Sequence, residues 1–82
     1  MVVLLTSPER VLFQGQAEKV IVPGEQGTFE VLVLHRPIIS RLLKGTVTVD
    51  EKHFAIRRGV MQAASDIVTV VVETEATGGA RR

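Results

Sequence analysis

The 82-residue chain has no cysteine, tryptophan or tyrosine, and only three phenylalanines. Without cysteine, neither a disulfide framework nor a thiolate metal site can form. A barrel that binds single-stranded nucleic acid by stacking needs aromatic side chains on a basic face. With so few aromatics, core packing is the expected use of all three phenylalanines, and a nucleic-acid partner is not indicated.

Charge of one sign and long apolar runs are lacking as well. Ten basic and nine acidic residues leave a formal net charge of +1, which gives no long-range field for nucleic acid or an anionic membrane. The apolar run that ends at Leu5 is far shorter than a signal-peptide core or the roughly 20 residues that span a bilayer. We therefore expect a soluble, cytoplasmic protein with no direct membrane insertion.

Apolar residues, by contrast, are abundant for a chain of this length. The chain is long enough for one domain, and a domain this small buries only about 60% of the surface that its unfolded chain exposes. Yet 45% of the residues are hydrophobic and the mean hydropathy is +0.25. We expect part of this apolar surface to lie outside and to be covered by another protein, or by self-association of the isolated domain.

The spacing of the apolar residues is that of strands. Val20 and Val22 fall on one face of their segment, and Val68, Val70 and Val72 fall on one face of another. Turn signals separate such segments at roughly 8–12-residue intervals. The pattern predicts an all-β fold, an antiparallel two-sheet β-sandwich of about 8–10 short strands.

Three local expectations refine this prediction. Polar tips at residues 50–52 and 65–66 each predict a tight turn between two strands. Residues 28–34 predict a strand with two apolar faces, covered on both. Residues 37–45 are the only candidate for a helical turn, because their apolar residues recur at spacings of three and four between Pro37 and Gly45.

The inventory of reactive groups is small. His53 lies beside a polar hairpin tip and is expected to be an exposed strand histidine. Catalysis by His35 would need an oriented partner such as a carboxylate or a hydroxyl, and Ser40, five residues away, does not make a recognisable triad. We therefore expect a protein that is not an enzyme.

Glycines and acidic pairs offer no cofactor or metal site either. The stretch PGEQG lacks the further Gly-Lys-Ser/Thr of a phosphate-binding loop, so it is expected to be a hairpin loop. The pairs Asp50/Glu51 and Glu73/Glu75 fall at a turn tip and near the chain end, where solvent surrounds them. No cofactor, metal or catalytic residue is predicted.

A series of short motifs follows in order from about Leu4 to Glu75. The motifs are Ser7-Pro8-Glu9, residues 13–18 (FQGQAE), residues 23–27 (PGEQG), residues 31–39 (VLVLHRPII), Leu43-Lys44-Gly45, Arg58-Gly59 and residues 68–73 (VTVVVE). Each motif is weak alone, but the ordered set is fairly specific. It resembles the N-terminal β-sandwich domain of the epsilon subunit of F-type ATP synthases.

The resemblance implies a sandwich domain over residues 1–76, a flexible tail over residues 77–82, and a non-catalytic role. In that family the domain sits at the foot of the central stalk, against the γ subunit and the polar loops of the c-ring, and couples ion-driven rotation to ATP synthesis. It implies a complex peripheral to the inner membrane. Carried over by position, the c-ring interface would be Glu25, Gln26, Gly27 and Thr28, and the γ interface would include Ser7, His35 and Ser40.

The chain departs from the family pattern at four positions. Glu30 and Arg58 each stand where the family has glycine, and Val33-Leu34 replace Pro-Gly, which predicts a continuous strand into His35. The family's C-terminal helical hairpin would begin where this chain stops, so we expect neither its inhibitory nor its ATP-binding role. The alternative is a divergent stand-alone sandwich that acts as a homo-oligomeric protein-binding module, and an enzyme acting through His35 is a third class.

Overall fold

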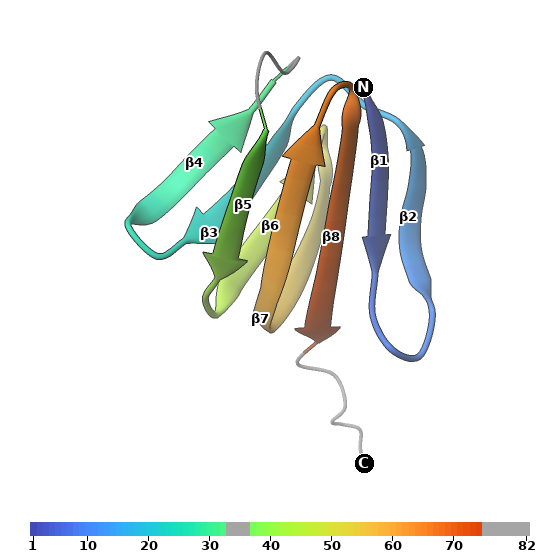
Figure 1. Ribbon diagram of the computed structural model, residues 1–82. Coiled ribbons are helices and arrows are strands. Elements are labelled where there is room, and N and C mark those ends of the chain that lie inside the picture. Colours follow the sequence, from blue (N-terminus) through green and yellow to red (C-terminus); the bar gives the residue numbers. More distant parts are fainter. Residues whose placement is uncertain (33–36, 75–82) are drawn as a thin grey trace.

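The computed structural model describes residues 1–32 and 37–74, and within these ranges the protein is built from strands alone (Figure 1). The strands are β1 (Val2–Thr6), β2 (Val11–Gln16), β3 (Val20–Gly24), β4 (Gly27–Val31), β5 (Ile38–Leu42), β6 (Gly45–Val49), β7 (Lys52–Ala64) and β8 (Ile67–Thr74). The predicted all-β sandwich is confirmed.

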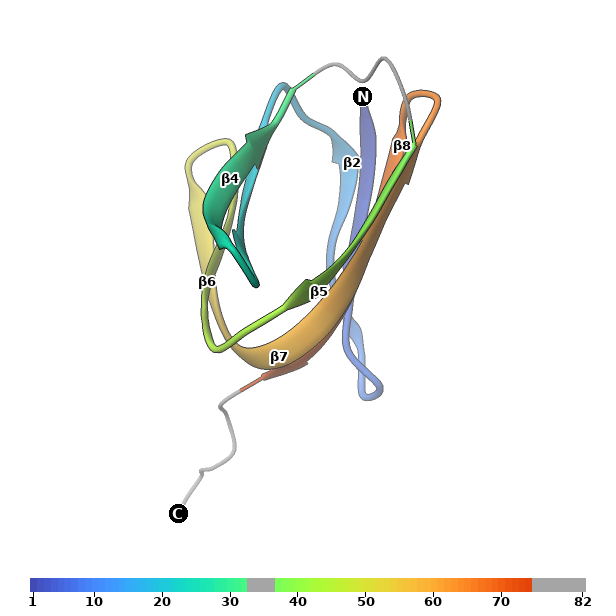
Figure 2. The same ribbon diagram turned by 60° about the vertical axis from the view of Figure 1, so that its left-hand side comes forward.

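The strands form two layers that share one long strand. The first layer runs β2-β1-β8-β7-β5, and the second runs β7-β6-β3-β4. The first half of β7 pairs with β6 and its second half pairs with β5 and β8, so β7 curves from one layer into the other (Figure 2). All pairings are antiparallel except β1 with β8, which is parallel.

The strand β7 continues through Gly59 as one element of 13 residues. A register shift between Ile56 and Arg58 marks a bulge opposite β8. A Cβ at Gly59 would lie 2.6 Å from the carbonyl oxygen of Val71, so only glycine allows β7 and β8 to approach here. The strand bends at this point instead of ending.

The core lies between the layers and follows the predicted alternation. In β8 the side chains of Val68, Val70 and Val72 are buried, whereas Ile67 and Val71 face outward. The largest fully buried side chains are Leu5, Leu42, Ile56, Met61 and eight valines: Val3, Val20, Val22, Val47, Val49, Val68, Val70 and Val72. Small β-branched residues fill most of the interior, as suits two pleated faces packed together.

The predicted helical turn at residues 37–45 is wrong, because residues 38–42 form β5. Each of its five residues pairs with β7. Apolar side chains on both faces of this strand reproduce helix-like spacing: Leu42 is buried, while Ile39 is 74% exposed. Ladder pairing with β7 therefore overrides the local periodicity.

The strand predicted over residues 28–34 is shorter than expected and only one face is covered. β4 ends at Val31, and Leu32 beyond it is 52% exposed. Within β4, Phe29 is half-buried and Val31 is buried, whereas Thr28 and Glu30 on the other face are exposed. Val33 and Leu34 lie outside the described residues, as does the predicted tail at residues 77–82.

Both predicted polar turns are confirmed, and each contains a residue with positive φ. Asp50 has a φ of 52° and Ser65 a φ of 55°. One carboxylate oxygen of Asp50 accepts hydrogen bonds from the backbone N–H groups of Glu18 (3.0 Å) and Lys19 (3.1 Å), and the backbone N–H of Asp50 donates to the Lys19 carbonyl (3.0 Å). These hydrogen bonds attach the β6–β7 turn to the segment that leads into β3.

Candidate docking surfaces

The outer face of the first layer carries the expected surplus of apolar side chains. Val60 on β7 and Val71 on β8 are direct cross-strand neighbours and are 50% and 49% exposed. Val2 on β1 pairs with Ile67 on β8 in the same way, and both are exposed. Adjacent apolar side chains on several strands form a surface suited to a protein partner.

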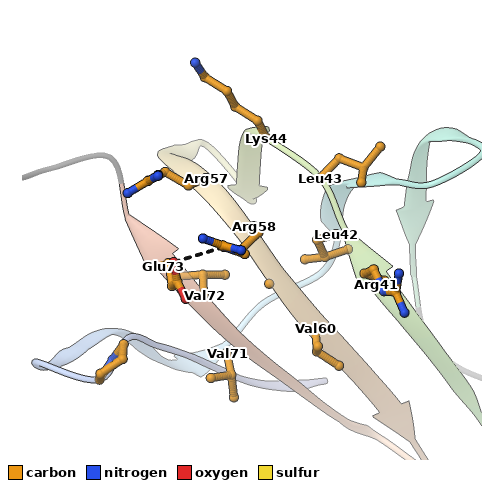
Figure 3. Close-up of a pocket in the computed structure, with 12 residues that line it drawn as sticks. Arg41, Leu42, Leu43, Lys44, Arg57, Arg58, Val60, Val71, Val72 and Glu73 are labelled. Carbon is orange, nitrogen blue, oxygen red and sulfur yellow. Dashed lines mark hydrogen bonds and ion pairs between the residues drawn. The ribbon is translucent and has the colours of Figure 1, made fainter.

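A groove of about 1060 Å³ lies at one end of this face, between β5, β7 and β8 (Figure 3). Its polar lining is Arg41, Lys44, Arg57, Arg58 and Glu73, and its exposed apolar lining includes Leu43, Val60 and Val71. The polar part of the lining is therefore mostly cationic, and it surrounds an apolar floor.

The bulge in β7 explains why two consecutive arginines line one groove. Successive side chains of a regular strand point to opposite faces, but Ile56 is buried and both Arg57 and Arg58 are exposed. The side chain of Arg58 leaves the sheet, and its Nε–H donates to Glu73 Oε1 at 3.0 Å. Among the described non-glycine residues, positive φ occurs only at Asp50 and Ser65, so Arg58 carries no such strain.

The residues predicted for the c-ring interface form the β3–β4 hairpin tip. Glu25, Gln26, Gly27 and Thr28 are all exposed. Gly27 has a φ of 119°, which the turn requires and glycine permits. The carboxylate of Glu25 lies 3.5 Å from the guanidinium of Arg41 on β5. This ion pair joins the hairpin tip to the first layer.

The two described residues of the predicted γ interface lie apart. Ser40 is half-buried on β5, donates to the Arg41 carbonyl (3.2 Å) and lines a shallow depression with the hairpin tip. Ser7 follows β1 and is only 7% exposed; its hydroxyl donates to the Arg10 carbonyl (3.2 Å) and accepts from the Arg10 N–H (3.3 Å). β8 and β7 separate β1 from β5, a distance of roughly 14 Å at ordinary strand spacing.

The third predicted γ residue, His35, lies outside the described residues. Ser40 adjoins the β3–β4 hairpin tip. Ser7 instead makes hydrogen bonds within the turn that follows β1, and its exposed neighbour Pro8 lines the groove between β5, β7 and β8. The structure brings the predicted c-ring loop together with Ser40 but not with Ser7.

The described residues present few groups that chemistry could use. His53 is exposed on β7, as expected, and its Nδ1 lies 3.0 Å from Thr48 Oγ1. Over residues 1–32 and 37–74, no three histidine or acidic side chains gather as metal ligands would. The same part of the chain holds no helix of the length and apolarity that a membrane span needs.

Two features were missed at the level of sequence. The Asp50 carboxylate was expected to be solvated, yet it holds the backbone of residues 18–19. The Arg57-Arg58 pair was visible in the sequence, but its common orientation depends on the bulge. An acidic residue at a hairpin tip is a signal for the first feature, because aspartate tolerates positive φ and accepts backbone hydrogen bonds.

The described residues form an all-β sandwich whose exposed apolar face and groove are suited to binding another protein. Comparison with protein families then gives a specific match: residues 1–77 fit the family described as ATP synthase, Delta/Epsilon chain, beta-sandwich domain. The chain belongs to this family.

Curated relatives agree. The chain is 36% identical over 74 residues to an ATP synthase epsilon chain of Afipia carboxidovorans, a match that covers 85% of this chain and 54% of that protein. It is 38% identical over 73 residues to one of Maricaulis maris, covering 84% and 55%. The chain thus spans about half the length of the curated relatives it matches.

Solved structures share the fold at low identity. A chain in the central stalk and c-ring structure of Tetrahymena thermophila mitochondrial ATP synthase has a TM-score of 0.79 at 12% identity, covering 89% of this chain and 63% of that one. A chain in the Euglena gracilis mitochondrial ATP synthase structure, which contains the c-ring, has a TM-score of 0.79 at 15% identity, covering 88% and 49%.

Proposed function

We propose that this chain is the β-sandwich part of a central-stalk epsilon subunit in an F-type ATP synthase. It contacts the γ subunit and the c-ring, catalyses no reaction itself, and couples ion-driven rotation to ATP synthesis in a complex on the cytoplasmic side of the inner membrane. The family match over residues 1–77 carries the proposal, and the names of the relatives support it.

The β3–β4 hairpin tip is the proposed c-ring contact. Glu25, Gln26, Gly27 and Thr28 are exposed at the end of a short hairpin, so a partner can reach them without any change in the fold. The Glu25–Arg41 ion pair ties the tip to β5. A surface ion pair contributes less than about 1 kcal/mol, but it limits the movement of the tip relative to the first layer.

The proposed γ contact includes Ser40, His35 and the turn that contains Ser7. Ser40 adjoins the hairpin tip, so β5 lies between the two proposed interfaces. β5 is held by β7 along its whole length. Torque applied at the tip therefore passes into a continuous hydrogen-bonded layer, which is what a rigid coupling element needs.

Single-cysteine cross-linking tests the assignment, because these 82 residues contain no cysteine. Gln26→Cys and Ser40→Cys are made separately and introduced into the ATP synthase of the protein's own source. We expect Gln26→Cys to cross-link to a c subunit and Ser40→Cys to γ. Glu51→Cys is the control: it is exposed at the β6–β7 tip, and the Val20↔Val49 pair puts that tip at the opposite end of β3 from the β3–β4 hairpin.

Failure of both test positions to cross-link to γ or c, in membranes that contain the chain, would contradict the proposal. The exposed apolar face also favours a second candidate, a homo-oligomeric protein-binding module. Cross-links between two copies of this chain, with none to γ or c, would support that candidate instead.

A further inference from the structure

The cationic groove concentrates positive charge that the chain as a whole does not have. Its lining includes four cationic side chains, Arg41, Lys44, Arg57 and Arg58, against one carboxylate, Glu73, a net of +3. The entire chain has a formal net charge of +1, so the remaining residues sum to −2. Because the groove is positive and the rest of the chain is negative, an anionic partner is attracted to the groove in preference to the other surfaces.

The arginines of the groove keep donors available for such a partner. Arg58 uses its Nε–H on Glu73 at 3.0 Å, and Arg41 meets Glu25 through one terminal nitrogen at 3.5 Å. A guanidinium has five N–H donors. Each of these contacts therefore holds the arginine side chain in place and leaves other N–H donors for a bound partner. Within residues 1–32 and 37–74, Arg57 has no ion pair, and it is exposed.

The floor of the groove is apolar, which a site for a small free anion would not need. Leu43, Val60 and Val71 are each about half exposed, and Val60 and Val71 are cross-strand neighbours. A partner that covered these side chains would remove their apolar surface from water, which favours binding. The groove thus offers an apolar contact surrounded by cationic groups.

We propose that this groove is a docking site for an acidic segment of another polypeptide, one that places apolar side chains on the floor and carboxylates against the arginines. Among the described residues no aromatic side chain lines the groove, so a nucleotide base would find no aromatic ring on which to stack. The site is a groove, and the headgroups of a flat lipid layer reach a recessed site less easily than a protruding one. The proposal depends on the groove alone and goes beyond the central-stalk assignment, because it names the chemistry of the bound segment.

The test is an NMR titration of the isotope-labelled 82-residue chain with a short capped peptide that alternates glutamate and leucine. A peptide of the same length that alternates lysine and leucine is the control ligand. We expect saturable shifts of the backbone amides of Leu43, Arg58, Val60 and Val71 with the acidic peptide only. The affinity should fall at higher salt, because exposed charges are screened.

Variants separate charge from fold. Removing both charges in Arg57→Gln/Arg58→Gln should weaken peptide binding about tenfold, the loss expected for two exposed ion contacts. Lys52→Gln removes one charge at the β6–β7 tip, outside the groove, and should leave binding unchanged. Unchanged spectra of unbound variants verify that both fold.

Equal binding of the two peptides, absence of saturable shifts, or shifts confined to residues outside the groove would each overturn the proposal. Identical shifts of these amides with inorganic phosphate at the same concentration would also overturn it. So would shifts of these amides on addition of phosphatidylglycerol vesicles when the acidic peptide causes none. These outcomes leave the cross-linking result untouched, so failure here is distinguishable from failure of the central-stalk assignment.

Discussion

Asp50 allows a sharp test of how the β6–β7 turn stabilises the sandwich. Its carboxylate accepts two backbone N–H bonds from residues 18 and 19, 3.0 and 3.1 Å long, and its backbone has a φ of 52°. Hydrogen bonds to a charged group contribute about 1.5–3 kcal/mol when shielded. Because these bonds are exposed, we take a value below this range, about 1 kcal/mol, for the pair together.

Three substitutions separate the carboxylate from the backbone conformation. Asp50→Asn keeps an acceptor oxygen and tolerates positive φ, so we expect a loss of less than about 1 kcal/mol. Asp50→Gly removes the acceptor but permits the φ, and should cost about 1 kcal/mol. Asp50→Ala removes the acceptor and also strains the backbone, and should cost about 2 kcal/mol. The expected order of destabilisation is Asn, then Gly, then Ala.

Urea unfolding followed by circular dichroism measures these differences, and in thermal unfolding the Ala variant should melt about 8–16 °C lower. Glu51→Ala is the matched control, since Glu51 is the exposed neighbour at the same tip. An Asp50→Ala variant as stable as the natural chain, or an Asn variant as unstable as the Ala variant, would refute the reasoning.

The remaining predictions concern the core and the bulge. Leu42→Ala should lower the free energy of unfolding by about 2–5 kcal/mol, because Leu42 is fully buried, whereas Leu43→Ala in the groove should cost less than about 1 kcal/mol; urea unfolding of both decides. Gly59→Ala should destabilise by about 1–3 kcal/mol, since its Cβ would lie 2.6 Å from a backbone oxygen that cannot move freely. Glu73→Gln should change stability by less than about 1 kcal/mol, because its ion pair with Arg58 is exposed.

Each of these three predictions has an outcome that would contradict the packing described. Equal losses for the two leucines would show that Leu42 is not in the core. A Gly59→Ala variant as stable as the natural chain would mean that β7 and β8 are not in close contact at the bulge. A loss of several kcal/mol on Glu73→Gln would require a buried rather than an exposed pair.

The strands were predictable from sequence where one face alone is buried. β8 shows this well, because Val68, Val70 and Val72 alternate with outward residues that a partner or solvent can meet. β5 was not predictable, because Ile39 is apolar and yet exposed. Its apolar pattern then fits a helix as well as a strand, and only pairing with β7 decides between them.

The candidate site was predictable only in its local parts. The β3–β4 hairpin tip follows from Pro23, Gly24 and Gly27, which are neighbours in sequence. The cationic groove joins residues 41–44, 57–60 and 71–73, and its two arginines share a face only through a register shift against β8. A single sequence carries no signal for that shift, because it depends on which strand lies beside β7.

The most direct test of the central claim, that this sandwich works by docking onto the stalk, is its association with γ. Gel filtration with light scattering compares the chain alone with the chain mixed with the γ subunit from its own source. The account predicts a single new peak with the summed mass of one copy of each. Two unchanged peaks, or a homo-oligomer that γ does not alter, would contradict it.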